Sequence, residues 1–244
     1  MEKDSSPKMI IEIVSLFPEG IRTILNESIL ARAQRFGVVD IDFIQLRDFT
    51  EDKHNTVDDK PYGGGPGMVL KADPIAKAFE SIEKKRPEPK PFVILTSPQG
   101  RTLDQDLVEE LSQHDRLTIL CGHYKGVDQR AIDRFVDMEV SIGDYIVTGG
   151  ELPAAVIVDS VVRLLPGVLG DIESARGDSF SSGLLDFPHY TQPAEWRGEK
   201  VPDVLASGHH ANIAKWQLEQ AIDRTKTLRP DLYKRWLEKK DNEG

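Results

Sequence analysis

The segment Ser141-Ile-Gly-Asp-Tyr-Ile-Val-Thr-Gly-Gly-Glu-Leu-Pro153 joins a short apolar strand to a helix through two glycines, Gly149 and Gly150. Glycine lets the backbone of such a turn lie directly against a ligand. Two earlier segments have the same character, Ser97-Pro-Gln-Gly100 and Cys121-Gly-His-Tyr-Lys-Gly126, and each follows an apolar run. We therefore expect three strand ends to line one pocket, an arrangement typical of an enzyme.

Apolar patterning predicts alternating strands and helices over most of the chain. The expected strands cover 10–16, 38–46, 91–96, 117–121 and 138–142, and the expected helices cover 18–37, 72–85, 102–113, 127–135, 151–165, 209–226 and 230–240. Alternation of this kind indicates an α/β fold with a mostly parallel sheet covered on both faces. Ligands bind such sheets at the carboxyl ends of the strands, where the three glycine-bearing segments fall.

Changes in composition divide the chain into four parts. Residues 1–8 are polar and are expected to form a disordered N-terminal extension, and residues 9–166 are expected to form the α/β domain. Residues 167–188 begin with a stretch rich in Gly, Ser and Asp and are interpreted as a flexible linker or lid. Residues 189–244 predict a small C-terminal helical domain.

The composition is that of an ordinary globular protein of 244 residues. No apolar run approaches the roughly 20 residues that a membrane-spanning helix needs, and the first residues lack the apolar core of an export signal. We therefore expect a cytoplasmic protein with no membrane partner. The single cysteine, Cys121, excludes an internal disulfide and ends the apolar run Leu117-Thr-Ile-Leu120, so we expect a buried structural thiol.

The net charge of −10 argues mildly against a nucleic-acid partner, because Lys and Arg drive binding to phosphates. The charge is unevenly distributed, however. Residues 189–240 contain ten Lys and Arg against seven Asp and Glu, a local charge of +3. This basic segment is compatible with a polyanionic partner and also with a solvated helix surface.

Several common ligand-binding motifs are absent from the sequence. No Gly-x-Gly-x-x-Gly follows the first strand, and Gly63-Gly-Gly-Pro-Gly67 lacks the lysine and the hydroxyl of a P-loop. The six histidines do not have zinc spacing, and no serine lies in a nucleophile elbow. A nicotinamide enzyme, a P-loop ATPase, a zinc site and a serine hydrolase are therefore not predicted, and no residue is assigned to a metal.

Seven short motifs occur in order along the chain. They are Asp58-Asp-Lys-Pro-Tyr-Gly-Gly-Gly-Pro-Gly-Met68, Ser97-Pro-Gln-Gly-Arg101, Cys121-Gly-His-Tyr124, Ser141-Ile-Gly-Asp-Tyr145, Gly149-Gly-Glu-Leu-Pro153, Pro166-Gly-Val-Leu-Gly170 and Asp178-Ser-Phe180. Each motif is weak alone, but their order and separations are specific. Together they resemble the bacterial tRNA (guanine-N1-)-methyltransferase family, and the match runs from about Ile10 to about Trp216.

The resemblance implies a SPOUT-type methyltransferase, whose domain contains a deep trefoil knot that binds S-adenosylmethionine. It implies methylation of N1 of guanosine 37, which lies 3′ of the anticodon in tRNA. It also implies a homodimer with active sites shared between subunits, and it leaves a requirement for Mg²⁺ open. The alternatives are a knotted RNA 2′-O-methyltransferase and an RNA-binding module without catalysis.

The resemblance assigns a set of residues to S-adenosylmethionine. Adenine needs apolar walls and backbone hydrogen bonds, which these residue types can supply. The alternative for the glycines is an ordinary turn. The set comprises Leu95, Thr96, Ser97, Pro98, Gly122, Tyr124, Ile142, Gly143, Asp144, Tyr145, Ile146, Val147, Gly149, Gly150 and Pro153.

Asp178 matches the catalytic aspartate of the family and Arg163 its partner. Methylation at N1 of guanine requires removal of the N1 proton, which a carboxylate within hydrogen-bond reach can accept. The guanidinium group of arginine can stabilise the negative charge that builds up on O6. The alternatives are a helix N-cap for Asp178 and, for Arg163, a pairing with Asp159 one turn earlier.

The tRNA is expected to contact two regions. An exposed aromatic ring can stack on an unpaired nucleotide, while cations hold phosphates. The residues that we expect to bind the tRNA are Tyr62, Gly63, Gly64, Gly65, His189, Tyr190, Lys215 and Arg224. Two positions depart from the family pattern: Lys125 stands where an acidic residue is common, and Gln192 stands where an arginine is common.

Overall fold

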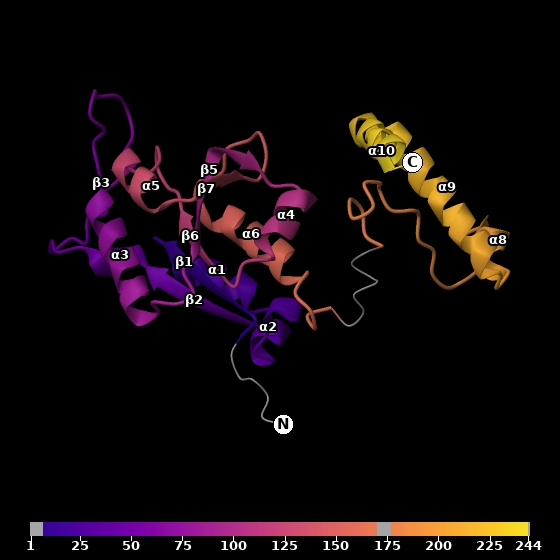
Figure 1. Cartoon of the computed structure of the whole chain (residues 1–244), viewed down its shortest axis with the longest axis horizontal. Coiled ribbons are helices and arrows are strands. Elements are labelled where there is room, and N and C mark those ends of the chain that lie inside the picture. Colours follow the sequence, from indigo (N-terminus) through magenta and orange to yellow (C-terminus); the bar gives the residue numbers. More distant parts are fainter. Residues whose placement is uncertain (1–6, 170–176, 244) are drawn as a thin grey trace. The chain divides into compact units, whose positions relative to one another are not determined.

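The computed structural model describes residues 7–169 and 177–243, and the chain forms two compact units, Met1–Gly170 and Asp171–Gly244 (Figure 1). The first unit contains a five-stranded sheet with flanking helices, and the second is mainly helical. The predicted α/β fold class with a C-terminal helical region is confirmed. Residues 1–6 of the predicted extension and residues 170–176 of the predicted linker lie outside the described residues.

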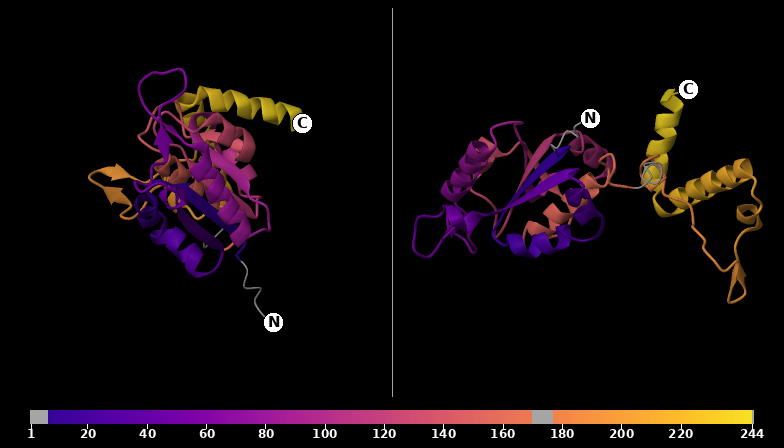
Figure 2. Two further views of the ribbon diagram at one scale, coloured as in Figure 1. Left: turned by 90° about the vertical axis from the view of Figure 1, so that its left-hand side faces the viewer. Right: turned by 90° about the horizontal axis from the view of Figure 1, so that it is seen from below.

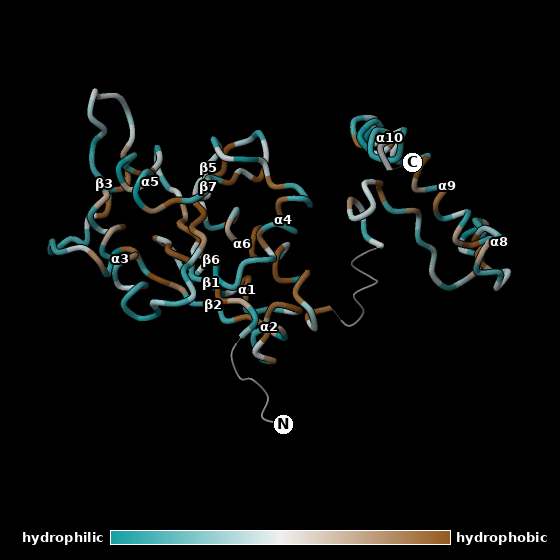
Figure 3. The backbone as a smooth tube through the Cα atoms, in the orientation of Figure 1, coloured by the Kyte–Doolittle hydropathy of each residue, from teal (hydrophilic) through white to brown (hydrophobic). Residues whose placement is uncertain are grey.

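The main sheet is parallel throughout, with strand order β2-β1-β6-β5-β7. The strands are β1 (Met9–Ser15), β2 (Val39–Gln45), β5 (Phe92–Thr102), β6 (Arg116–Cys121) and β7 (Met138–Ser141). All six residues of β6 are buried, because a central strand of a parallel sheet is covered on both faces. Figure 3 shows apolar residues concentrated along these strands.

Helices cover both faces of the sheet (Figure 2). One apolar cluster contains buried side chains of α1 (Pro18–Leu25), α2 (Ser28–Arg35), α4 (Gln105–Leu111) and α6 (Glu151–Val162). The other contains those of η1 (Leu46–Phe49), α3 (Ala72–Lys85) and α5 (Gln129–Phe135). The helix α6 buries seven of its twelve residues and is apolar almost throughout.

Three predicted boundaries were wrong. The single helix expected over 18–37 is two helices, because α1 ends at Leu25 and α2 begins at Ser28, whose φ is 52°. The strand expected to end at residue 96 continues to Thr102. The following helix therefore begins at Gln105 instead of residue 102, after Asp104, whose carboxylate accepts the amide of Leu107.

The long loop after β2 contains two short strands that periodicity could not predict. They are β3 (Asp58–Asp59) and β4 (Val69–Leu70), which pair antiparallel and close the intervening glycine-rich loop. Leu70 also bridges Val127 next to α5. This contact holds the base of the loop against the segment that precedes α5.

The second unit contains a small hairpin and three helices. The hairpin strands are β8 (Glu195–Trp196) and β9 (Glu199–Lys200), and the helices are α8 (Asp203–Ala206), α9 (His210–Leu228) and α10 (Pro230–Glu243). Thr225 ties α9 to the preceding segment, since its hydroxyl accepts the amide of Leu185 (2.8 Å). In the described part of the chain, no helix is long and apolar enough to cross a membrane.

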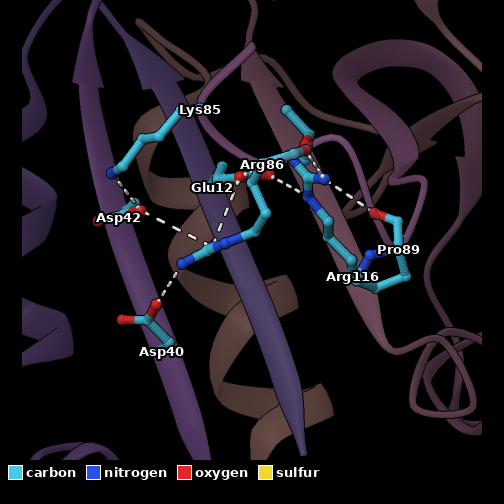
Figure 4. Close-up of polar contacts among 8 residues, drawn as sticks. Glu12, Asp40, Asp42, Lys85, Arg86, Pro89 and Arg116 are labelled. Atoms are coloured by element: carbon cyan, nitrogen blue, oxygen red, sulfur yellow. Dashed lines mark hydrogen bonds and ion pairs between the residues drawn. The ribbon is translucent and has the colours of Figure 1, made fainter. Parts of the chain in front are cut away.

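A buried ion pair lies in the middle of the sheet (Figure 4). Arg116 on β6 donates through Nε and Nη2 to the carboxylate of Glu12 on β1 (3.0 and 2.8 Å), and both side chains are almost fully buried. The Nη1 atom of Arg116 donates to the carbonyl oxygens of Arg86 and Pro89 (2.6 and 2.8 Å). The pair therefore connects two central strands to the segment after α3.

Candidate functional site

Hydrogen bonds join Thr96 of β5, the last residue before an irregularity in that strand, to the segments that follow β6 and β7. This region is named the joined strand ends below. The amide of Gly150 donates to the carbonyl oxygen of Gly122 (2.7 Å), and the amide of Gly122 donates to Oγ1 of Thr96 (3.1 Å). His123 and Gly149 form an antiparallel bridge beside them. The three segments that the sequence singled out therefore lie in direct contact at one edge of the sheet.

Close packing explains why two of these positions are glycine. A Cβ atom on Gly150 would lie 2.8 Å from Cα of Cys121 and even closer to the hydroxyl of Thr96. A Cβ atom on Gly122 would lie 2.6 Å from the carbonyl oxygen of Thr96. Contact between the three segments therefore excludes side chains here whether or not a ligand is bound.

The segment after Thr96 leaves the sheet and then pairs with β7 a second time. Val140 pairs with Thr96 and again with Arg101, so residues 97–100 bulge out of the sheet between these two pairings. A Cβ atom on Gly100 would collide with the backbone of Glu139 and Val140. The backbones of β5 and β7 thus touch without intervening side chains.

The segment that follows β7 is folded by its own hydrogen bonds. The amide of Gly143 donates to Oγ of Ser141 (3.2 Å), and the hydroxyl of Tyr145 donates to the carbonyl oxygen of Ile142 (3.2 Å). Tyr145 and Ile146 are nevertheless 57% and 79% exposed. Two large apolar side chains therefore stand open to solvent beside the joined strand ends.

The residues that resemblance assigns to S-adenosylmethionine all lie in these segments or at the start of α6. Leu95, Thr96, Gly150 and Pro153 are buried, so they shape the edge of the sheet more than they cover a ligand. The half-buried members are Ser97, Gly122, Ile142, Gly143, Val147 and Gly149. The exposed members are Pro98, Tyr124, Asp144, Tyr145 and Ile146.

Sequence reasoning missed a polar cluster beside the joined strand ends. The hydroxyl of Ser15, at the end of β1, donates to Oε1 of Glu151 (2.7 Å) and accepts the amide of Phe17 (2.8 Å). The ring of Phe17 packs edge-on against His123, with ring centroids 5.5 Å apart. The Nδ1 atom of His123 is buried and has no hydrogen-bond partner among the described residues.

An apolar depression lies next to this cluster. Its volume is about 250 Å³, and it is lined by residues of α1, the segment before α6 and the start of α6. Phe17, Ile24 and Leu152 line it and are about half exposed. Val156, one turn beyond Leu152, is also exposed. These four side chains form an apolar face, named the α1–α6 face below.

Cys121 is buried at the end of β6, as expected. Burial raises the pKa of its thiol well above the usual value, and the nearby carboxylate of Glu151 raises it further. The thiolate is the reactive form of cysteine. Cys121 is therefore a packing residue and not a nucleophile.

The two catalytic candidates belong to different units. Arg163 is the C-cap residue of α6 and is half-buried. Asp178 is half-buried at the start of the described part of the second unit. Asp178 begins a turn and not an α-helix. In this turn, the amide of Ser181 donates to the carbonyl oxygen of Asp178 (3.4 Å). The helix N-cap interpretation of Asp178 is therefore wrong.

The candidate tRNA contacts in the first unit lie on the open loop between β3 and β4. Tyr62 is fully exposed. Gly63, Gly64 and Gly65 have φ values of 85°, 79° and 105°, and no atom lies within 4 Å of the position of a Cβ atom on any of them. The positive φ values therefore favour glycine at these three positions, whereas steric crowding by neighbouring atoms does not.

The candidate tRNA contacts in the second unit are mostly exposed. His189 pairs with Asp186 through Nε2 (2.7 Å), and the ring of Tyr190 lies 6.4 Å from that of Trp216. Lys215 and Arg224 lie on α9 and are exposed. Lys215 makes a long ion pair with its helix neighbour Glu219 (3.9 Å).

The side chain of Lys125 packs against Gly67 at the end of the glycine-rich loop. A Cβ atom on Gly67 would lie 2.6 Å from Cγ of Lys125, whose amide donates to the carbonyl oxygen of Met68 (2.9 Å). Gln192 lies in the exposed segment before the β8–β9 hairpin. Within residues 7–169 and 177–243, His, Cys, Asp and Glu form no group of three or more that could hold a metal ion.

Comparison with known proteins connects these features to one family. The family model described as tRNA (Guanine-1)-methyltransferase TrmD matches residues 9–235. This range covers the joined strand ends, both catalytic candidates and most of the second unit. The resemblance in the motifs therefore extends over almost the whole chain.

Curated relatives agree with the family match. A protein of Brevibacillus brevis is 55% identical over 224 residues, covering 92% of this chain and 91% of the relative. A protein of Lachnospira eligens is 50% identical over 235 residues, covering 96% and 99%. A protein of Ruminiclostridium cellulolyticum is 49% identical over 225 residues, covering 92% and 96%. All three are named tRNA (guanine-N(1)-)-methyltransferase, and this chain belongs to the tRNA (guanine-1)-methyltransferase family, which makes it a methyltransferase.

Proposed function

We propose that this protein transfers the methyl group of S-adenosylmethionine to N1 of guanosine 37 in tRNA. Family membership over residues 9–235 and the names of the relatives support tRNA and N1 of guanine as the target. The observation that carries the proposal is the junction of three strand ends, where Gly122 and Gly150 hold the backbones together. We also propose a cytoplasmic location, because the proposed substrate is tRNA.

The junction suits a bent methyl donor. Exposed Tyr145 and Ile146 supply apolar surface for an adenine ring, and the glycine-bearing segments bring backbone hydrogen-bond groups to the same edge. We also propose a trefoil knot in this domain, and family membership supports it. When bound, S-adenosylmethionine supplies an electrophilic methyl group on sulfur.

We assign the general base to Asp178 and the stabilisation of the guanine anion to Arg163. The carboxylate of Asp178 takes the N1 proton, and the freed lone pair forms the N–CH₃ bond as the S–CH₃ bond breaks toward sulfur. Since aspartate has a reference pKa of about 3.9, it is a weak base for guanine N1. Stabilisation of O6 by a permanently charged guanidinium compensates for this mismatch.

We assign the homodimer contact to the α1–α6 face. Its exposed side chains Phe17, Ile24, Leu152 and Val156 form an apolar surface that a soluble monomer would leave in water. The active site is proposed to be shared between the two subunits. Val156→Asp should shift the protein toward the monomer in sedimentation velocity and reduce methylation, and an unchanged sedimentation coefficient would contradict this contact.

A direct assay tests the function. Purified protein with S-adenosylmethionine should methylate a tRNA transcript that carries guanosine at position 37 and should fail when that base is replaced. Nucleoside analysis of the product should give 1-methylguanosine, whereas a 2′-O-methylated nucleoside would identify the knotted 2′-O-methyltransferase instead. Equal methylation of both transcripts would overturn the assignment. Repeating the assay with a chelator settles the requirement for Mg²⁺.

A further inference from the structure

The β8–β9 hairpin is a well-formed element that contributes nothing to a core. Glu195 pairs with Lys200 and Trp196 with Glu199 across the two strands. The amide of Val201 donates to the carbonyl oxygen of Ala194 (3.0 Å) and closes the base. All residues from Glu195 to Lys200 are exposed. The hairpin therefore buries no side chain that would stabilise the second unit, and its presence needs another explanation.

The turn of the hairpin holds an arginine in an unfavourable conformation. Arg197 and Gly198 have φ values of 54° and 88°, the combination that a two-residue hairpin turn requires. Glycine and asparagine adopt this conformation readily, whereas an arginine is disfavoured there. Strained residues on exposed loops often have a functional role.

The arginine stacks on the only tryptophan of this hairpin. The guanidinium carbon of Arg197 lies 4.7 Å from the ring centroid of Trp196, which is 59% exposed. The turn thus presents a large aromatic face and a guanidinium group side by side. The nearest cation on the other strand, Lys200, pairs with Glu195 (3.7 Å).

These two groups match a nucleotide better than a protein partner. An aromatic ring can stack on any unpaired base, and a guanidinium group binds the adjacent phosphate. An apolar protein contact would require further apolar side chains around Trp196, but its neighbours in the hairpin are charged. The segment 189–240 around the hairpin also carries a net charge of +3.

We propose that Trp196 and Arg197 form a stacking site for an unpaired base of the tRNA, with Arg197 holding the adjacent phosphate. This proposal rests on the proposed function, since it takes tRNA as the substrate. Specific recognition of RNA targets unpaired loop bases, which can be splayed out onto aromatic side chains. Arg197 at a positive φ keeps the cation beside the ring before RNA binds.

Four variants separate the roles of the ring and the cation. Trp196→Ala removes the stacking surface and Trp196→Phe keeps part of it. Arg197→Gly removes the cation and suits the positive φ, so the hairpin should remain folded, and Arg197→Lys keeps the charge without the planar group. Circular dichroism and the affinity for S-adenosylhomocysteine should be unchanged in all four.

Binding and turnover give the expected results. Loss of base stacking should raise the Kd for tRNA about 5-fold to 100-fold in Trp196→Ala, with a smaller effect in Trp196→Phe. Arg197→Gly should weaken binding and reduce the slope of log K against log salt by about one. The Michaelis constant for tRNA should rise, while kcat at saturating tRNA should stay close to that of the wild type.

Fluorescence gives a second readout that a purely structural role would not produce. The chain has three tryptophans, Trp196, Trp216 and Trp236. Stacking on a base should quench Trp196, so Trp196→Phe should lose a large part of the quenching that tRNA causes. Trp236→Phe is the matched control and should keep that part of the quenching, because Trp236 packs against Tyr233, which has no assigned contact with tRNA.

The alternative outcomes distinguish failure of the stacking site from failure of the proposed function. An unchanged tRNA affinity of Trp196→Ala at all salt concentrations would exclude the stacking site, while normal methylation would leave the proposed function intact. An altered sedimentation coefficient in Trp196→Ala would assign the ring to a contact between copies of the chain. If the wild type binds tRNA through Trp196 but transfers no methyl group, the proposed function fails and the stacking site stands.

Discussion

Asp178 and Arg163 carry the proposed chemistry, and Asp178 can be tested alone. Asp178→Ala should reduce kcat by about 10²-fold to 10⁴-fold, the range typical of a lost general base. Asp178→Asn should behave similarly, because an amide cannot accept the proton. Calorimetry should show an unchanged affinity for S-adenosylhomocysteine in both. Asp223→Asn, at an exposed position on α9, is the control and should keep normal activity. Full activity of Asp178→Ala would exclude Asp178 as the general base.

Gly150 tests whether contact between the strand ends stabilises the first unit. In Gly150→Ala the methyl group would lie 2.8 Å from Cα of Cys121 and collide with Thr96. The free energy of unfolding should fall by about 1–3 kcal/mol, the usual cost of overpacking. Gly20→Ala in α1 is the control, because its Cβ atom meets nothing within 4 Å. Chemical denaturation measures both, and equal stability of the two variants would contradict the packing role.

The sequence could predict part of the site at the level of single residues. The three glycine-bearing segments were recognisable because each follows an apolar run. The contact between Ser15 and Glu151 was not recognisable, because the residues are far apart in the chain and neither lies in a local pattern. The sequence also could not separate the two reasons for Gly150, close packing and approach to a ligand.

The buried ion pair between β1 and β6 makes a prediction about strand pairing. Glu12→Gln would leave Arg116 buried without its counter-charge, so the free energy of unfolding should fall by about 3–5 kcal/mol. Lys85→Met is the matched control, since Lys85 pairs with Asp42 at the surface. Its effect should stay below about 1 kcal/mol. Urea denaturation of both variants gives the comparison, and similar losses would rule out a special contribution of the buried pair.

Element prediction succeeded for long periodic segments and failed for short ones. The five strands of the main sheet were predicted from their apolar or alternating sequences, and α9 and α10 were predicted from long helical patterns. The strands β3, β4, β8 and β9 have two residues each, too few to show a period. The break between α1 and α2 contains neither glycine nor proline, and its helix-ending signal is Asn26 alone, the C-cap residue of α1.

The two units differ in how many side chains they bury. The first has two apolar clusters around its sheet. In the described part of the second unit, Leu184, Ala221 and Thr225 are the buried residues. Few buried contacts permit local opening. Hydrogen exchange should therefore be faster in α10 than in β6, and saturating tRNA should slow it in α9 and α10 without changing β6. Equal protection of α10 and β6 in the free protein would contradict this difference.

The strand order β2-β1-β6-β5-β7 could not be predicted from the sequence, because it depends on contacts between distant segments. Apolar periodicity in the sequence predicted the α/β fold class with a parallel sheet. The ordered motifs indicated the methyltransferase family. The proposed knot, the dimer and the tRNA target came only from resemblance. The whole molecule was thus predictable in class and family, but its connections were not predictable from local patterns.

The burial of Cys121 makes this protein suitable for labelling at a single site. It is the only cysteine of the chain, and the raised pKa of its thiol protects it from maleimide reagents. A cysteine introduced by Glu199→Cys at the exposed hairpin would then carry a fluorescent dye alone. Energy transfer between that dye and one on the anticodon loop would follow individual tRNA molecules as they arrive and leave.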